Sequence, residues 1–169
     1  MPIYTIGHSN HAFETFAGLL KSAGVTAIAD VRSAPYSKHC PQFRKNTLAA
    51  ASRAAGIAYV YLGDDLGGKP KNAAFYTHGR SDYGKIAATP GFHRAIARLL
   101  KGAKTHAIAL MCAEADPERC HRTGLIAPAL ETHGVEVLHL LPNGERRPHE
   151  TVAGGRSLFD GSAGGGKTL

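Results

Sequence analysis

The stretch that decides the fold is the apolar run Ala107-Ile-Ala-Leu-Met111 followed by Cys112-Ala-Glu-Ala-Asp-Pro-Glu-Arg-Cys-His-Arg122. The apolar run has the length and composition of a buried strand. Asp116-Pro117-Glu118 then predicts a helix start, because Asp caps free N–H groups, Pro fits the first helical position and Glu favours the positive end of the helix dipole. A strand that leads into a helix through a polar loop is the repeating unit of open α/β sheets, whose ligands bind at the carboxyl ends of the strands.

The same alternation of short β-rich runs and helical patterns extends outward in both directions. Strands are predicted at residues 3–6, 25–31, 57–62, 106–111 and 135–141. Helices are predicted up to Gly24, from Asn46 as a cap to Gly56, from Thr89 with Pro90, and from Pro117. Five strands alternating with four helices predict a single compact three-layer α/β domain, with a mainly parallel five-stranded sheet and helices on both faces.

Two segments break this rhythm. Residues 63–89 are rich in glycine and form a connection far longer than the ~4 to 6 residues typical of compact domains, which predicts either a functional flap or a disordered insertion. Residues 154–169 are rich in Gly and Ser, which predicts a flexible tail. The single domain is therefore expected to span residues 1–153.

The composition limits the class of protein. A chain of 169 residues, 43% of them hydrophobic, suffices for one domain with its own core. No apolar run reaches the ~20 residues of a membrane span and no signal peptide is evident, so we expect a cytoplasmic protein with reduced thiols and no membrane partner. The net charge of +7 favours an anionic small molecule or nucleic acid as partner, although a basic enzyme without such a partner fits the charge equally well.

The cysteine loop supplies the first catalytic candidates. Cys120 is predicted in the first helical turn, where the helix dipole and the neighbouring Arg119, His121 and Arg122 would stabilise a thiolate. The alternative is a buried cysteine that only packs. The charged neighbours of Cys120 favour a functional thiol.

Cys112 ends its predicted strand, at the position of the nucleophile in rhodaneses and cysteine phosphatases. The likeness is partial, because six residues separate Cys112 from Arg119 and no glycine opens the loop between them. Glu114 and its acidic neighbours would also repel a phosphate dianion. Phosphatase or sulfurtransferase chemistry is therefore the less favoured interpretation.

Polar residues also follow the first two predicted strands. Asp30 and Arg32 lie on one side of the pleat at the end of the second strand, either as a catalytic pair or as a structural ion pair. His8, Ser9 and Asn10 follow the first strand, where backbone N–H groups suit an anion, although Ser9 or Asn10 could simply cap the next helix. Because the carboxyl ends of parallel strands share one edge, all of these side chains are expected near Cys112.

The loop at residues 36–45 interleaves basic and aromatic residues, which suits stacking on a base or simply a solvated loop. Metal binding through the cysteines and through His8, His39 and His121 has little support, because no Cys-x-x-Cys pair or paired-histidine spacing is present.

Four motifs in order resemble one known family: Thr5-Ile-Gly-His-Ser-Asn10; Asp30-Val-Arg-Ser-Ala-Pro35 with Pro41-Gln-Phe43; Tyr61-Leu-Gly-Asp-Asp-Leu-Gly-Gly68; and Cys112-Ala-Glu114 with Cys120-His-Arg122. The chain resembles, over residues 3–149, the family called domain of unknown function 488. The resemblance implies a compact α/β domain with a cysteine-containing motif, and it implies no established reaction.

Our leading hypothesis is an enzyme whose pocket lies at the carboxyl edge of the sheet. One cysteine would be the nucleophile, one histidine the base and Glu114 a general acid or base. The predicted catalytic residues are Cys112, Glu114, Cys120, His121 and His8. The residues predicted to hold an anionic, nucleotide-like ligand are Ser9, Asn10, Asp30, Arg32, Arg119 and Arg122.

Two other hypotheses belong to different classes of protein. The first is a nucleic-acid-binding module that uses residues 36–45 and 63–89. The second is a thiol redox or metal-sensing protein that uses Cys40, Cys112 and Cys120. The sequence leaves the substrate, any cofactor and the oligomeric state open.

Overall fold

The computed structural model describes residues 1–150, and its central sheet has six strands in the order β3-β2-β6-β1-β7-β8. The strands are β1 (Ile3–Gly7), β2 (Ala27–Asp30), β3 (Ala58–Tyr61), β6 (Ile108–Cys112), β7 (Val137–Leu140) and β8 (Arg146–Pro148). The first five of these run parallel, as predicted. The predicted tail 154–169 and the last three residues of the predicted domain 1–153 lie outside the described residues.

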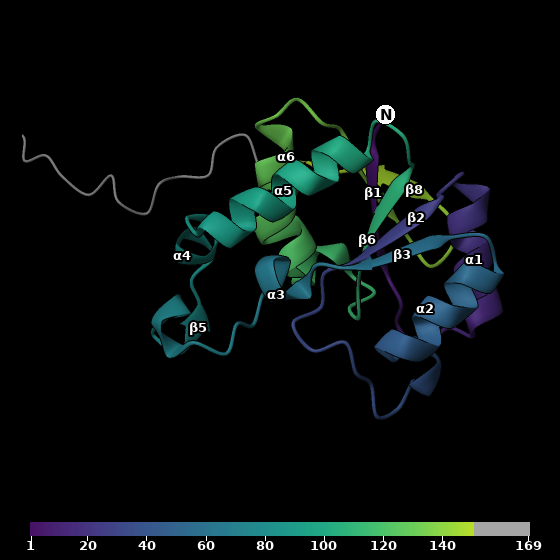
Figure 1. The fold of residues 1–169 in the computed structure, drawn as a ribbon, viewed down its shortest axis with the longest axis horizontal. Helices are drawn as coiled ribbons and strands as arrows, with labels where there is room; N and C mark the ends of the chain where they lie inside the picture. The colour runs from purple at the N-terminus through teal and green to yellow at the C-terminus, as the bar shows by residue number, and fades with distance from the viewer. Residues whose placement is uncertain (151–169) are drawn as a thin grey trace, which may run out of the picture.

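Helices cover both faces of the sheet and so complete the three predicted layers (Figure 1). The long helices are α1 (Phe13–Ser22), α2 (Lys45–Ala54) and α5 (Pro90–Gly102), and a shorter one is α6 (Ala127–Glu131). α1 and α2 share one core with the sheet, and α5 and α6 share the other. On β6, Met111 faces the first core and Cys112 the second, because successive side chains of a strand point to opposite faces.

The sheet has one strand more than the five predicted, because β8 pairs antiparallel with β7 at its edge. The chain turns between them at Asn143 and Gly144. Gly144 has a φ of 86°, and the Asn143 side chain accepts a hydrogen bond from the backbone N–H of Glu145 at 3.0 Å. All three residues of β8 are exposed, so this strand lacks the apolar alternation from which strands are predicted.

Residues 63–89 form a series of short elements instead of a long loop. These elements are α3 (Gly63–Leu66), η2 (Ala73–Phe75), β4 (Tyr76–Thr77), β5 (Arg80–Ser81) and α4 (Tyr83–Ala87). His78 and Gly79, with φ angles of 51° and 74°, form the two-residue turn between β4 and β5, a turn type that needs positive φ at both positions. The interpretation as a disordered insertion is therefore wrong, and a role as a flap stays a prediction.

Two predicted helix starts also differ. Asn46 lies inside α2, which begins at Lys45. Asp116 caps only a short turn, η3 (Pro117–Arg119), by accepting a hydrogen bond from the backbone N–H of Glu118 at 3.0 Å. Cys120 then has an extended backbone (φ −128°), and its carbonyl oxygen accepts the N–H groups of residues 123 and 124. Cys120 thus stands just before the helical residues, whereas the sequence predicted it within their first turn.

The helical residues after Cys120 begin with a π-helical turn, η4 (Arg122–Ile126), in which the N–H of Ala127 reaches the carbonyl oxygen of Arg122. Pro128 explains the wide turn, because proline has no N–H for an α-helical bond to Gly124 and its ring would clash with that carbonyl. π-helical turns occur frequently at functional sites. Here the turn brings Arg122 into the core beside the cysteines. None of the helices within residues 1–150 combines the length and apolar character that crossing a membrane requires.

The strand order creates a crevice at the carboxyl ends of β1 and β6. These neighbouring strands lead to opposite faces of the sheet, because β1 continues to α1 and β6 to α6. Loops that diverge in this way leave a gap above the sheet, which is where ligands bind in open α/β folds.

Candidate functional site

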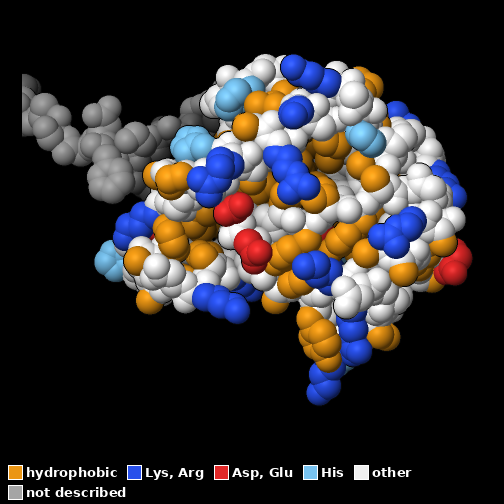
Figure 2. Space-filling model, in the orientation of Figure 1, with side chains coloured by type: hydrophobic (Ala, Val, Ile, Leu, Met, Phe, Trp, Pro, Cys, Tyr) orange, Lys and Arg blue, Asp and Glu red, His pale blue; other side chains and the backbone are white. Residues whose placement is uncertain are grey.

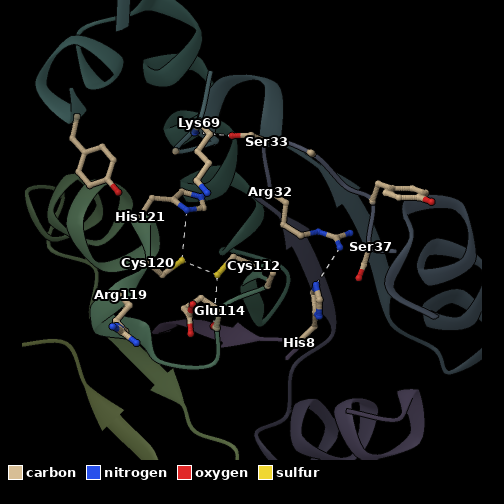
Figure 3. Close-up of a pocket in the computed structure, with 15 residues that line it drawn as sticks. His8, Arg32, Ser33, Ser37, Lys69, Cys112, Glu114, Arg119, Cys120 and His121 are labelled. Atoms are coloured by element: carbon tan, nitrogen blue, oxygen red, sulfur yellow. Dashed lines mark hydrogen bonds between the residues drawn. The ribbon is translucent and has the colours of Figure 1, made fainter. Parts of the chain in front are cut away.

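A cavity of about 440 Å³ occupies this crevice (Figure 3). Its walls come from the loops after β1, β2 and β6 and from residues 63–89. Seven residues predicted from the sequence line it: His8, Arg32, Cys112, Glu114, Arg119, Cys120 and His121. The four loops therefore meet at one edge, as their positions at the strand ends predict.

Two thiols lie in contact in this cavity. The Sγ atoms of Cys112 and Cys120 are 2.7 Å apart, so one thiol hydrogen-bonds to the other. Cys112 ends β6 and Cys120 follows η3, and both side chains are largely buried. The sulfur of Cys112 also lies 3.8 Å from the carbonyl oxygen of Glu114. The loop between the cysteines thus folds back so that two residues eight positions apart share one hydrogen bond.

The His121 imidazole is oriented as a proton acceptor for Cys120. Its Nε2 atom lies 2.9 Å from the carbonyl oxygen of Val31, which can only accept, so Nε2 carries the proton and donates. In the neutral ring Nδ1 is then free to accept, and it lies 3.5 Å from the sulfur of Cys120. Gly68 packs directly against this ring, since a Cβ at that position would lie 2.7 Å from the His121 Cβ.

The electrostatic surroundings shift the pKa values of the two thiols in opposite directions. The hydrogen bond from Cys112, the hydrogen bond with His121 and the nearby charge of Arg122 lower the pKa of Cys120. The shared hydrogen bond and burial raise the pKa of Cys112. The first proton therefore leaves the pair more easily than the second, and these directions favour Cys120 as the thiol that ionises, with Cys112 as its hydrogen-bond donor.

Arg122 is buried close enough to the cysteines for its charge to act on both thiols, and it is not one of the lining residues. Its side chain is 1% exposed, and its Nη2 atom donates to the carbonyl oxygen of Glu114 at 2.7 Å. Its Nε atom is buried with no hydrogen-bond partner within the described chain. A buried guanidinium of this kind favours a negative charge close by, and its charge acts to lower the pKa of both thiols and of His139.

Asp30 and Arg32 form a buried ion pair. Asp30 accepts from the Nε atom of Arg32 at 2.9 Å and from Nη2 at 2.7 Å, and it also accepts from the Tyr59 hydroxyl at 2.6 Å. Burial and this hydrogen bond raise the pKa of Tyr59. Asp30 thus occupies two of the side-chain donor atoms of Arg32, Nε and Nη2, and a catalytic role for the pair stays a prediction.

His8 is held as a neutral ring against Arg32. Its Nδ1 atom donates to the carbonyl oxygen of Ser9 at 2.7 Å, so Nε2 accepts from Nη1 of Arg32 at 3.3 Å. The ring stacks on Phe43 with 4.4 Å between centroids. Burial lowers the pKa of His8 to about 4. The lone pair that a catalytic base would use is therefore already engaged.

The remaining predicted residues after β1 do not line the cavity. The hydroxyl of Ser9 donates to the side-chain oxygen of Asn10 at 3.4 Å on the exposed side of the loop. Neither residue caps α1, whose N-cap position is Ala12 and has no side-chain hydrogen bond.

The other lining residues are not among the predicted site residues, although several lie in the candidate segments 36–45 and 63–89: Ser33, Ala34, Tyr36, Ser37, Gly68, Lys69, Tyr83 and Ala113. Lys69 points toward His121 in Figure 3, and its backbone N–H donates to the hydroxyl of Ser33 at 2.8 Å. The ring of Tyr83 packs against Gly124, and burial, together with the nearby Cys120, raises the pKa of Tyr83. The glycine-rich residues 63–68 were the one signal that this segment approaches other parts of the chain.

The cationic side chains of the cavity differ in whether they form an ion pair and in how exposed they are. Arg32 is paired with Asp30, whereas Arg119 and Lys69 are exposed and lie on different sides of Cys120 (Figure 3). On the face drawn in Figure 2, Lys and Arg side chains are spread among hydrophobic ones and form no single stripe. Within residues 1–150, no group of three or more His, Cys, Asp or Glu side chains is placed to hold a metal ion.

Comparison with known proteins gives one match. The model of the family described as Domain of unknown function DUF488 matches residues 12–128. The matched residues include the cysteine loop and the motif that begins at Asp30, whereas the motif around His8 precedes them. No curated protein and no solved structure matches the chain.

Proposed function

Because the chain belongs to the DUF488 family, a membership that names no reaction, we propose its function from the geometry of the cavity. The protein is a cysteine-dependent enzyme that attacks an electrophilic centre on a small anionic ligand. The proposal rests on one observation above all: the Cys120 sulfur contacts both the Cys112 thiol and the Nδ1 atom of His121 inside a cavity.

Cys120 is the nucleophile of this proposal, and His121 accepts its proton. An activated cysteine needs an adjacent base within hydrogen-bond reach and a third group that orients the base. The carbonyl oxygen of Val31 has the orienting role, because it fixes the His121 proton on Nε2. Cys112 is protonated and stabilises the thiolate, and the engaged lone pair of His8 makes that ring the weaker candidate for the base.

The ligand carries negative charge because the free cations of the cavity surround the nucleophile. Lys69 and Arg119 are exposed lining residues and supply this charge. A cavity of about 440 Å³ lies in the range of small-molecule sites. Glu114 lines the same wall, where its carboxyl group is placed to act as a general acid or base.

Alkylation of Cys120 by iodoacetate and by iodoacetamide tests both parts of the proposal. The two reagents differ in charge, and trypsin releases Cys120 in the peptide of residues 120–122, in which modification is read by mass. At pH 7 Cys120 is expected to react faster than free cysteine with both reagents, since a free thiol is only a few per cent ionised at that pH. If it reacts no faster, the nucleophile is wrong.

The ratio of the iodoacetate rate to the iodoacetamide rate reports the charge of the cavity. This ratio is expected to exceed that of free cysteine, and Lys69→Ala or Arg119→Ala is expected to lower it by about two- to fivefold, the effect of one exposed charge. Lys104→Ala is the matched control, because Lys104 is exposed and lies outside the lining residues. A wild-type ratio equal to that of free cysteine contradicts the anionic ligand.

One observation favours a second function, binding of single-stranded nucleic acid. Tyr36 is 64% exposed at the cavity wall, and the guanidinium of Arg44 lies 4.6 Å from its ring centre. Exposed aromatic and basic side chains suit stacking on bases and contact with phosphates. Fluorescence anisotropy with a labelled single strand at low salt tests it: binding that Tyr36→Ala weakens supports this function, and absence of binding excludes it.

A further inference from the structure

The contact between Cys112 and Cys120 goes beyond what a single nucleophile needs. A hydrogen bond from any hydroxyl or backbone N–H would stabilise the Cys120 thiolate, whereas here the donor is itself a thiol 2.7 Å away. In a disulfide the two sulfur atoms are about 2.05 Å apart, so bonding requires an approach of less than 1 Å. The chain between the cysteines is a loop and a single turn, η3, with exposed residues that leave room for this movement.

We propose that Cys112 and Cys120 form a dithiol that reduces small hydroperoxides through an intramolecular disulfide. This inference rests on the proposed nucleophile Cys120, and it is independent of the proposed anionic ligand. A small oxidant is the fitting substrate because Cys120 is only 9% exposed, so a bulky disulfide partner has no direct access to its sulfur. Hydrogen peroxide is small enough to enter the cavity that both sulfurs line.

The first step oxidises Cys120. Its thiolate attacks one oxygen of the hydroperoxide, the O–O bond breaks, and the sulfur becomes a sulfenic acid. The oxygen that leaves takes the proton that His121 accepted from Cys120, so water or an alcohol is released. Sulfur loses two electrons in this step and the peroxide gains them.

The second step joins the two cysteines. Cys112 attacks the oxidised sulfur of Cys120, the S–S bond forms, the S–O bond breaks, and the hydroxide that leaves departs as water with the proton of Cys112. Two equivalents of a small thiol then restore the dithiol by thiol–disulfide exchange, and are themselves oxidised to a disulfide. The cavity admits such a thiol to the bond.

The different surroundings of the two thiols fit these two roles. The attacking sulfur must be ionised, and the resolving thiol must stay protonated until the second step. Cys120 is the thiol with the histidine partner, and Cys112 has only the Glu114 carbonyl and Cys120 as partners. Cys40 is a natural control, because its sulfur donates to the carbonyl oxygen of Ser9 at 3.6 Å, outside the cavity.

The test treats the reduced full chain at pH 7 with one equivalent of hydrogen peroxide, blocks remaining thiols with N-ethylmaleimide and digests with trypsin. Cleavage places Cys112 in the peptide 105–119 and Cys120 in the peptide 120–122. We expect these two peptides joined by a disulfide, in the wild type and in Cys40→Ser. The rate is expected to exceed that of free cysteine by at most about 30-fold, the ratio of thiolate fractions at pH 7, because a thiolate of lower pKa is also a weaker nucleophile.

Two further variants separate the steps. Cys112→Ser is expected to stop at a sulfenic acid on Cys120, which dimedone traps, and Cys120→Ser is expected to lose the fast reaction. Thermal unfolding checks that both variants are folded, and turnover of peroxide with excess dithiothreitol gives a second readout in the wild type.

The outcomes distinguish this inference from the proposed function. If no joined peptide forms while Cys120 is still alkylated rapidly, the dithiol inference is overturned and the proposed nucleophile stands. If Cys120 reacts slowly with peroxide and with both alkylating reagents, both are overturned.

Discussion

The guanidinium of Arg122 reaches back eight residues and donates a hydrogen bond to the carbonyl oxygen of Glu114 at 2.7 Å. The same carbonyl lies above Gly7, where a Cβ atom would overlap it. The cysteine loop therefore points a carbonyl oxygen toward Cys112 and Arg122. In rhodaneses and phosphatases, glycines leave backbone N–H groups free to point toward an anion. Here the carbonyl oxygen of Glu114 points toward Cys112 instead, so this loop differs from theirs in the orientation of that peptide group as well as in its length.

Arg122→Met tests the role of this buried charge. The substitution leaves the Glu114 carbonyl without its donor, and we expect a loss of about 1–3 kcal/mol in the free energy of unfolding, measured with urea. We also expect the pKa of Cys120 to rise, because a positive charge near the thiolate is lost. Alkylation rate against pH measures this shift. Arg119→Met is the exposed control, and an equal shift in both variants would contradict the assignment.

Gly68→Ala tests the position of His121. The added methyl group would lie 2.7 Å from the His121 Cβ and 2.8 Å from its Cγ, so the imidazole must move. We expect slower alkylation of Cys120 at pH 7 because the ring no longer accepts its proton. Gly18→Ala in α1 is the control, since no atom lies within 4 Å of the new methyl and helix propensity should add about 0.5–1 kcal/mol. Unchanged Cys120 reactivity in Gly68→Ala would show that His121 has no part in its ionisation.

Asp30→Asn should cost far more stability than Tyr59→Phe. The first leaves Arg32 as an unpaired charge in the core, which typically costs about 3–5 kcal/mol. The second removes one hydrogen bond to a carboxylate, about 1.5–3 kcal/mol at most for a half-buried hydroxyl. Urea unfolding of both variants gives the comparison. Similar losses would mean that Asp30 serves something other than the ion pair.

The stability of the protein should fall as the pH falls from about 7 to 4. Burial lowers the pKa of both His8 and His139 to about 4, below the usual 6.5 of histidine. The unfolded chain therefore binds more protons than the folded one in this window, and each histidine adds a slope of at most about 1.4 kcal/mol per pH unit.

The double variant His8→Gln with His139→Gln should flatten this pH dependence, and His93→Gln, which alters an exposed histidine, should leave it unchanged. Urea unfolding at several pH values makes the measurement. A double variant with the wild-type slope would assign the acid sensitivity to other groups.

The sequence was sufficient to predict the parallel sheet and the edge at which the loops meet, because buried strands and capped helices have local sequence patterns. Thr89, for example, caps α5 as predicted, and its hydroxyl accepts the N–H of Phe92. β8 was missed because an exposed edge strand with Pro148 has no apolar pattern. The cap expected at Asn46 failed because the chain enters α2 directly from the turn at residues 41–43.

The candidate site was predicted in its position but not in its contacts. Adjacent motifs located Cys112, Cys120 and His121, while the sharing of a hydrogen bond between the two sulfurs depends on how the loop folds back. Lys69 and Tyr83 reach the cavity only through the path of residues 63–89 in three dimensions. The sequence singled out residues 63–89 as a segment, but no local pattern shows which of its side chains reach the cavity.

Two separate parts of the chain supply the thiols of the cavity and one of its walls. The thiols and their histidine belong to β6 and the residues after it, whereas Gly68, Lys69 and Tyr83 belong to a separate excursion of the chain. Exchanges at Lys69 or Tyr83 would reshape the cavity wall without touching the two sulfurs, whereas Gly68 must stay small because it packs against His121. In the proposed enzyme, the shape of the cavity can therefore be altered at one segment while both thiols keep their place in the sheet and the loop that follows it.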